Sequence, residues 1–357
     1  MNTIRWASTC SGRACPPWSG LLVLSAAGGS RALLFLLAAV CVCVSDAAAQ
    51  NTSPALLILE KSDTQLAIAD PATLKIVARV PSGPDPHEVI ASPHGKFAYI
   101  TNYGGGGHGA YHTISVVDLA ARKALPPIDL GVLRGAHGID FAGNKVYFTA
   151  EVNKAIGSIE PADAKVDWVL GTGQNATHMV VVNKDVSRIF TSNIGSDSIT
   201  IMEADGNGNW NETPVTVGKG PEGFDVSPSG KEVWAANSRD GSVSIIDVAS
   251  KKVVGTVEVG TKRSNRLKFT PDGKFVFVSD LGGTDLVILD AAARKEVKRL
   301  KIGHGAAGIL MQPDGARAFV AASPDNEVFV IDLKSLEVAG QIPTGKNPDG
   351  LAWAQSK

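Results

Sequence analysis

The chain has 357 residues, of which 44% are hydrophobic and 6% aromatic, and its formal net charge at pH 7 is -1. This length and composition are typical of a globular protein with a large core, and the 38 glycines indicate many tight turns. Because acidic and basic residues nearly balance, the composition argues against an electrostatic attraction to nucleic acid.

The N-terminal segment contains an apolar run at residues 32–44 that follows a basic residue. It ends at residues 47–49 (Ala-Ala-Ala), a small-x-small pattern that predicts signal-peptidase cleavage before Gln50. A run this short favours an export signal over a membrane anchor. We therefore expect a signal segment at 1–49, no membrane span in the mature chain, and a periplasmic or secreted domain at 50–357.

The cysteines give two further constraints. All four precede the predicted cleavage site: Cys10, Cys15, Cys41 and Cys43. The mature chain is therefore expected to contain neither thiols nor disulfides, so that packing alone stabilises it. The chain also has no Cys-x-x-Cys-His attachment motif, which excludes a c-type haem.

A repeated pattern organises the rest of the chain, and residues 220–260 carry its clearest copy. Four short alternating runs occur there, at 223–226, 232–236, 243–247 and 253–259, and turn residues separate them. Such runs are typical of an antiparallel meander. The pattern returns at intervals of 41–50 residues along the chain, and four strands in a unit of this length predict propeller blades.

The residues at the start of each unit form a column that sets the register of the repeat: His87, His137, His178, Glu222, Asn265, Ala307 and Asp349. After Asp349 only one strand's length of chain remains, whereas residues 55–80 supply three strands ahead of the first complete unit. We therefore expect an all-β, seven-bladed β-propeller with four antiparallel strands per blade. Its ring would be closed by N-terminal strands joining the C-terminal strand.

The second-strand motif Tyr99-Ile-Thr-Asn102 resembles that of the bacterial and archaeal YVTN-repeat β-propellers, and the resemblance covers residues 55–355. It implies a propeller fold and an exported protein, but no particular activity, because most members are uncharacterised. Similar propellers occur in surface-layer proteins, in the haem-bearing half of denitrifying nitrite reductases and in the copper-cluster half of nitrous oxide reductase.

The column also provides the candidate site, because in a four-stranded blade it lies at one mouth of the central channel. His87, His137 and His178 lie on consecutive blades, and three imidazoles facing a carboxylate are a typical zinc or copper ligand set. The fourth ligand would be water, substrate, Glu222 or Asp349. The alternative is that these side chains only cap a water-filled channel.

Further residues are expected on the same face, at the ends of second strands and in two loops. The loop at 103–112 is enlarged and rich in glycine, and it is either a lid or a solvent-exposed loop. Together with Asp349, the predicted ligand-binding face comprises Glu60, Asn102, His108, His112, Glu151, Asn193, Asn237, Asp280 and His304.

A small basic cluster lies in the fifth unit, at Lys262, Arg263, Arg266 and Lys268. Cations this closely spaced more often form a solvated face than an anion site. We therefore expect these side chains on the surface.

Two functional interpretations remain open. In the first, the protein is a non-enzymatic, monomeric module that binds a small molecule, a metal or a protein partner at the channel mouth. In the second, it is an enzyme of the lyase, lactonase or oxidoreductase type, with a bound metal or a His/Glu pair and Glu222 as the candidate catalytic residue. Comparable propellers support the second only by analogy of fold. A third interpretation, DNA binding, is disfavoured because the sequence has no basic stripe.

Overall fold

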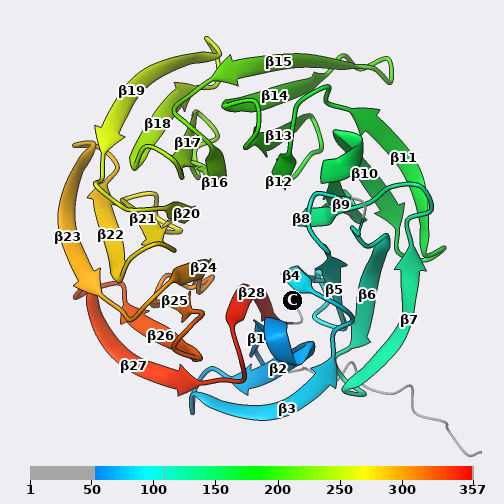
Figure 1. Cartoon of the computed structure of the whole chain (residues 1–357), viewed down its shortest axis with the longest axis vertical. Helices are drawn as coiled ribbons and strands as arrows, with labels where there is room; N and C mark the ends of the chain where they lie inside the picture. The colour runs from blue at the N-terminus through cyan, green and yellow to red at the C-terminus, as the bar shows by residue number, and fades with distance from the viewer. Residues whose placement is uncertain (1–52, 108, 356–357) are drawn as a thin grey trace, which may run out of the picture. The chain divides into compact units, whose positions relative to one another are not determined.

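The computed structural model describes residues 53–107 and 109–355, so the predicted signal segment lies outside the described residues. Seven four-stranded antiparallel sheets are arranged as blades around a central axis (Figure 1). The predicted seven-bladed propeller is thus confirmed. In the described part of the chain, no helix is long and apolar enough to cross a membrane.

Each blade runs from an inner strand at the axis to an outer strand at the rim. The inner strands are β4 (Pro86–Ala91), β8 (Ala136–Ala142), β12 (Thr177–Val182), β16 (Pro221–Val226), β20 (Ser264–Phe269), β24 (Ala306–Met311) and β28 (Pro348–Ala354). The second strands are β5 (Phe97–Asn102), β9 (Lys145–Ala150), β13 (Arg188–Asn193), β17 (Glu232–Asn237), β21 (Phe275–Asp280), β25 (Arg317–Ala322) and β1 (Ala55–Glu60). The third strands are β6 (Thr113–Asp118), β10 (Ala155–Glu160), β14 (Ser198–Ala204), β18 (Ser242–Asp247), β22 (Asp285–Asp290), β26 (Glu327–Asp332) and β2 (Gln65–Asp70). The outer strands are β7 (Lys123–Asp129), β11 (Lys165–Gly171), β15 (Trp210–Thr216), β19 (Lys252–Glu258), β23 (Lys295–Lys301), β27 (Glu337–Pro343) and β3 (Lys75–Pro81). Blades 1 to 7 follow this order, and two 3-10 turns, η1 (Lys61–Asp63) and η2 (Glu151–Asn153), follow β1 and β9.

Blade 7 joins the two ends of the propeller. Strand β28 pairs antiparallel with β1, with Leu57 opposite Ala352 and Ile58 opposite Leu351. The closure predicted from the incomplete seventh repeat is therefore confirmed. It pairs an edge of β28 that would otherwise present unsatisfied backbone groups.

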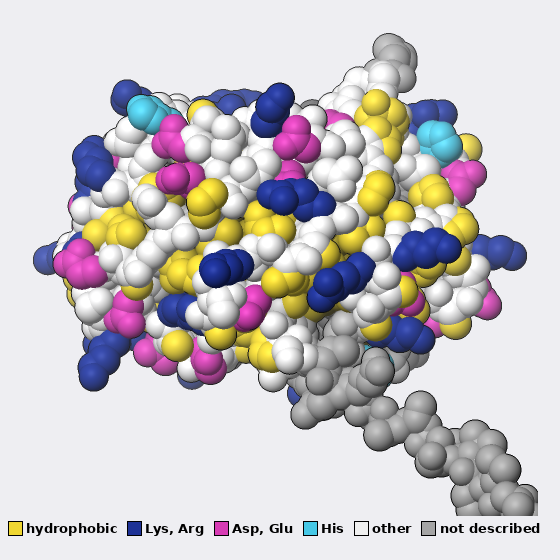
Figure 2. Space-filling view, turned by 90° about the horizontal axis from the view of Figure 1, so that it is seen from below, with side chains coloured by type: hydrophobic (Ala, Val, Ile, Leu, Met, Phe, Trp, Pro, Cys, Tyr) yellow, Lys and Arg dark blue, Asp and Glu magenta, His cyan; other side chains and the backbone are white. Residues whose placement is uncertain are grey.

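The core lies between neighbouring blades. The second strands carry a large side chain at one repeated position, and Phe190, Trp234, Phe277 and Phe319 are almost fully buried there. Trp234 of blade 4, for example, packs edge-on against Phe269 of blade 5, with ring centroids 5.6 Å apart. The side of the ring in Figure 2 shows basic, acidic and hydrophobic side chains intermixed.

Each inner strand contains a β-bulge at the same position. In β4, Pro86 pairs with Asn102 and Val89 with Ile100, so two residues lie opposite one. The same shift occurs in all six other inner strands. The first residue of each bulge is the column residue, and a bulge locally re-aims side chains.

The second residue of the bulge is glycine in four blades, at Gly138, Gly223, Gly308 and Gly350. A Cβ atom on Gly308 would lie 2.1 Å from the carbonyl oxygen of Asp349 in the next inner strand. Real Cβ atoms do not approach backbone this closely, so glycine here allows the inner strands to pack around the axis.

We expect Gly308→Ala to lower the free energy of unfolding by about 1–3 kcal/mol, because the added methyl group overpacks the contact between two inner strands. The matched control is Gly171→Ala in outer strand β11, where an added Cβ meets no atom within 4 Å. It should change stability by no more than about 0.5 kcal/mol. Urea denaturation of both variants measures the difference, and equal effects would contradict close packing at the axis.

Candidate functional site

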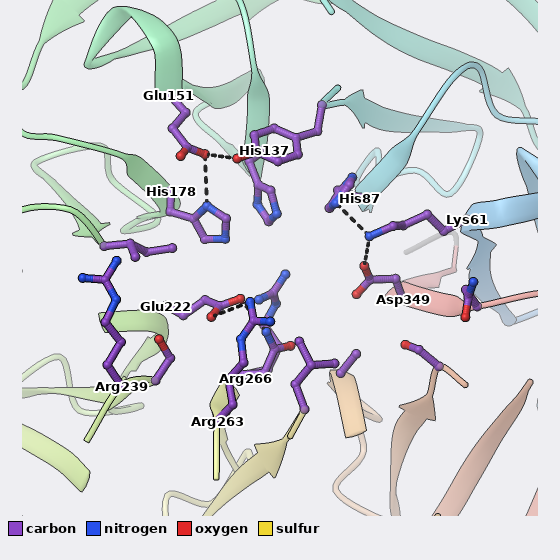
Figure 3. Close-up of a pocket in the computed structure, with 18 residues that line it drawn as sticks. Lys61, His87, His137, Glu151, His178, Glu222, Arg239, Arg263, Arg266 and Asp349 are labelled. Atoms are coloured by element: carbon purple, nitrogen blue, oxygen red, sulfur yellow. Dashed lines mark hydrogen bonds and ion pairs between the residues drawn. The ribbon is translucent and has the colours of Figure 1, made fainter. Parts of the chain in front are cut away.

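All seven column residues line one cavity of about 610 Å³, which we call the mouth cavity (Figure 3). Besides the column, its lining includes Lys61, Tyr103, Glu151, Ile194, Ser238, Arg239, Arg263, Arg266, Leu281, Ser323 and Asn347. The structure therefore brings the three predicted histidines together with Glu222 and Asp349. Of the predicted second-strand-end residues, only Glu151 joins them.

Hydroxyl groups of the second strands hold the column in place. The hydroxyl of Thr101 accepts a hydrogen bond from the backbone N–H of Glu88 in its own blade, at 3.1 Å. It also donates to the carbonyl oxygen of His137 in the next blade, at 2.8 Å. Thr149 donates in the same way to the carbonyl oxygen of His178, at 2.8 Å. The threonine of the YVTN-like motif therefore fixes the backbone of the histidines.

The asparagines that end second strands do not line the mouth cavity. Asn102, Asn193 and Asn237 are fully buried. Asn193 donates to the hydroxyls of Ser198 and Thr200, at 3.1 and 2.9 Å. Their amides stabilise the blade itself, so the prediction that they face a ligand is not supported.

Two predicted acids also have structural roles. Glu60 accepts the backbone N–H of Gly345 at 2.7 Å, and Asp280 accepts that of Arg263 at 2.9 Å. Both carboxylates thus hold loops that connect neighbouring blades.

Two further predicted histidines, His112 and His304, lie away from the mouth cavity. His112 pairs with Asp129 at 2.9 Å and His304 with Asp325 at 3.1 Å, both at exposed positions. His108 is outside the described residues.

The three column histidines form a packed cluster with Tyr103. The rings of His137 and His178 stack with centroids 3.6 Å apart. Tyr103 contacts His87 and His137 edge-on, at 4.8 and 4.9 Å. Burial, reinforced by the neighbouring His178, lowers the pKa of His137 well below its ordinary value. His137 is therefore neutral at physiological pH.

Both ring nitrogens of His87 have partners. Nδ1 lies 3.1 Å from the carbonyl oxygen of Asp85, and Nε2 lies 2.9 Å from Nζ of Lys61. Lys61 also pairs with Asp349 at 3.3 Å. Burial and the Lys61 charge lower the pKa of His87. A neutral ring protonated on Nδ1 satisfies both contacts, so a metal ion at Nε2 would have to displace Lys61.

One ring nitrogen of His178 has a hydrogen-bond partner, and the other has none among the described residues. Oε2 of Glu151 accepts a hydrogen bond from the Tyr103 hydroxyl at 2.6 Å and lies 3.3 Å from Nδ1 of His178. Burial alone would raise the pKa of Glu151, but the bonds from His178 and Tyr103 outweigh it and the pKa is lowered. Because a carboxylate only accepts, Nδ1 carries a proton, and in the neutral ring Nε2 has a lone pair.

The histidine cluster does not form a metal site of recognised geometry. Among the described residues, no group of three or more His, Cys, Asp or Glu side chains is arranged to hold a metal ion. The histidines meet as the repeat predicts, but their role as zinc or copper ligands stays a prediction.

Arginine side chains lie on the other side of the cavity from the histidines (Figure 3). Arg263 lies 3.5 Å from Oε2 of Glu222, whose Oε1 accepts a hydrogen bond from Asn265 at 2.7 Å. Arg239 and Arg263 are exposed at the rim, whereas Arg266 is buried. The prediction of a solvated basic cluster is therefore wrong for Arg266, because the bulge turns its side chain toward the axis.

Unpartnered polar atoms concentrate in this cavity. Six buried side-chain atoms have no hydrogen-bond partner among the described residues, and four of them belong to residues that line the mouth cavity. These are Nδ1 of His137, Nε2 of His178, Oδ1 of Asn265 and Nη1 of Arg266. Because buried polar groups are normally hydrogen-bonded, such a group of donors and acceptors is suited to a polar ligand.

Sequence comparisons find a haem-domain model over part of this chain and two distantly similar proteins. The model for the cytochrome D1 heme domain matches residues 171–317. The chain is 22% identical to the uncharacterized protein YncE of Salmonella typhimurium over 250 residues, which cover 64% of this chain and 70% of that protein. It is 32% identical to protein NirF of Pseudomonas aeruginosa over 110 residues, which cover 30% of this chain and 28% of NirF. The chain is a propeller distantly similar to YncE and to the cytochrome D1 haem domain.

Solved structures share the fold. Kuenenia stuttgartiensis hydrazine synthase aligns with a TM-score of 0.70 at 19% identity, covering 80% of this chain and 94% of that chain. The periplasmic gluconolactonase PpgL of Pseudomonas aeruginosa aligns with a TM-score of 0.68 at 16% identity, covering 85% and 99%. The dihydro-heme d1 dehydrogenase NirN, in complex with DHE, aligns with a TM-score of 0.58 at 14% identity, covering 86% and 75%.

The buried histidines predict a pH dependence of stability. Below pH 6.5 the unfolded chain protonates histidines whose pKa is lowered in the folded state, such as His137. As the pH is lowered, the free energy of unfolding should therefore decrease by up to about 1.4 kcal/mol per pH unit for each such histidine. In His137→Asn this slope should be shallower between pH 6.5 and 5.5, as measured by urea denaturation. At pH 8, where the imidazole is neutral in both states, the slopes should coincide; an unchanged slope at low pH would show that His137 is not held neutral.

Proposed function

We propose that the mouth cavity binds an anionic tetrapyrrole of the haem d1 class without covalent attachment. The observation that carries this proposal is the group of four buried, unpartnered polar atoms, two on the imidazoles at one side of the cavity and two on Asn265 and Arg266 at the other. The match to the cytochrome D1 heme domain, which includes His178 and the arginines, supports it. The fold of the dihydro-heme d1 dehydrogenase NirN, whose structure is in complex with DHE, is compatible with it.

The residues of the cavity suit such a ligand. Nε2 of His178 has no partner among the described residues, so in the neutral ring it would be suited to hold the iron of such a ligand. Arg239 and Arg263 at the rim could pair with peripheral carboxylates, which guanidinium groups bind in a bidentate manner. The rings of His87 and Tyr103 offer flat surfaces. When bound, an iron tetrapyrrole would supply redox chemistry at its metal.

The remaining roles belong to this chain's own side chains. Glu151 orients His178 through Nδ1 and so fixes which nitrogen faces the ligand. Tyr103, in the enlarged loop at 103–112, donates to the same carboxylate and covers the imidazoles. The loop thus acts as a roof that excludes water from the histidines.

Export is part of the proposal. The apolar run and the Ala-Ala-Ala sequence before Gln50 support cleavage of a signal and a periplasmic location for this YVTN-type propeller. Detection of a mature N-terminus at Gln50 in the periplasmic fraction would test it.

A second candidate function is hydrolysis of a lactone. The observation that favours it is the Glu151–His178 pair, in which a carboxylate orients an imidazole whose other nitrogen is an acceptor in the cavity. Such a pair could activate water as a general base. The fold of the gluconolactonase PpgL is compatible with this function.

We expect the purified mature protein to bind haem d1, and iron protoporphyrin IX as a simpler probe, with a shifted absorption spectrum. His178→Ala should change the spectrum of the complex, because the imidazole that would hold the iron is lost. Arg263→Gln should weaken binding about ten- to a hundredfold without that spectral change, because it removes a charged hydrogen-bond donor. Titration followed by absorbance measures both effects.

The matched control is His304→Ala, an exposed histidine outside the cavity, which should bind as wild type does. Failure of the wild-type protein to bind either haem would overturn the proposal. Hydrolysis of gluconolactone that His178→Ala abolishes would favour the second candidate. Stoichiometric zinc or copper that is lost in His137→Ala would instead favour the three-histidine metal site.

A further inference from the structure

The second position of the inner-strand bulge departs from glycine in three blades. Glu88 occupies it in blade 1, Met179 in blade 3 and Arg266 in blade 5. In the other four blades the position is glycine, and the inner strands pack closely there. The three side chains therefore project toward the axis, where they have room that the neighbouring glycines leave.

Arg266 and Glu88 form an ion pair across the axis. Nε and Nη2 of Arg266 both donate to one oxygen of Glu88, Oε1, with Nε at 3.1 Å. The two residues are 178 positions apart in sequence. Arg266 is only 5% exposed, so its charge is removed from bulk water. The ion pair therefore links blades 1 and 5, and its arginine lines the mouth cavity.

The pair uses only part of the guanidinium. A carboxylate that bound Arg266 in a bidentate manner would offer both oxygens, whereas here one oxygen accepts both bonds. Nη1 is buried and has no partner among the described residues. An unpaired donor on a buried cation costs free energy that an additional anionic acceptor would recover.

The charges around Arg266 keep it cationic. Burial alone would lower the pKa of Arg266, but the charges of Glu88, Asp349 and Glu222 outweigh this and raise the pKa. The guanidinium is therefore a permanent positive charge at the base of the cavity.

Arg266 lies where two cavities meet. It lines the mouth cavity and also a second cavity of about 440 Å³ on the inner strands, which Glu88 lines as well. The second cavity has Ile90, Leu310 and Trp353 in its wall, together with the charged residues Asp140, Asp225 and Lys268. Arg266 therefore borders both cavities, whereas Glu88 borders only the second one.

We propose that Arg266 is a buried carboxylate receptor and that Glu88 is its internal counter-ion. A carboxylate of a ligand in the mouth cavity binds Nη1 of Arg266, while Glu88 holds Nε and Nη2 and offsets part of the guanidinium charge. This inference rests on the proposed function, which identifies the ligand that bears the carboxylate. A small dicarboxylate is expected to bind the same guanidinium whether or not the ligand is a tetrapyrrole.

The test compares two substitutions with opposite expected effects. Arg266→Gln should weaken binding of succinate about ten- to a hundredfold, because the charged donor is lost. Glu88→Gln should strengthen it by a similar factor, because the negative charge that offsets Arg266 and repels the ligand carboxylate is removed. Isothermal titration calorimetry with succinate, and absorbance titration with iron protoporphyrin IX, measure both changes. If Arg266 only stabilised the fold, neutralising its partner Glu88 would not strengthen succinate binding.

Two further variants keep the test decisive. Arg266→Gln leaves Glu88 buried without its partner, so the double variant Glu88→Gln/Arg266→Gln removes both charges and should fold yet bind succinate as weakly as the single variant. Arg188→Gln, which removes an arginine outside the mouth cavity, should bind succinate as wild type does.

The outcomes separate this inference from the proposed function. Succinate binding that depends on Arg266, without haem binding, would leave the receptor standing and overturn the tetrapyrrole. Haem binding that neither Arg266→Gln nor Glu88→Gln alters would support the tetrapyrrole and overturn the role of Arg266 as a carboxylate receptor. Absence of succinate binding in the wild-type protein, or weaker binding in Glu88→Gln, would overturn the receptor and counter-ion assignment.

Discussion

One hydroxyl group in each of four blades couples the inner strands to one another. Thr101, Thr149, Ser192 and Ser279 each accept the bulge N–H of their own blade and donate to the column carbonyl of the next. Each bond satisfies a backbone group that the bulge has removed from the sheet ladder. The same contact sets where the column side chains begin, so the geometry of the mouth cavity depends on it.

The buried charges of the cavity are paired in a way that leaves specific atoms open. Glu151 accepts a hydrogen bond from Nδ1 of His178, and Nε2 has no partner among the described residues. Glu88 engages Nε and Nη2 of Arg266 and leaves Nη1. In each case a carboxylate fixes the orientation of its partner. The open atoms are therefore positioned in advance, which lowers the ordering cost of binding a ligand.

The sequence predicted the fold because blade repeats are nearly periodic, and the column followed from the same register. It failed where a side chain's direction depends on the bulge. Arg266 belongs to a basic run that would alternate between faces in a regular strand, but the bulge places it and the adjacent Asn265 together on the cavity. The prediction that asparagines face a ligand was unsupported for another reason. Asn102, Asn193 and Asn237 recur because their side chains stabilise the blades that contain them. The available signal for Arg266 was its departure from glycine at a repeated position.

The blades share one architecture, so recognition at the mouth depends on what distinguishes them. Blades 1 to 3 contribute neutral or hydrogen-bonded imidazoles, blades 4 and 5 contribute guanidiniums, and blade 6 contributes only Ala307 to the column. A ligand with the symmetry of the ring would gain nothing from this arrangement. A ligand with an aromatic or metal-bearing body and carboxylates on one side would satisfy both walls in a single orientation. The asymmetry of the column therefore selects orientation as well as charge, and it does so on a scaffold whose backbone is almost unchanged from blade to blade.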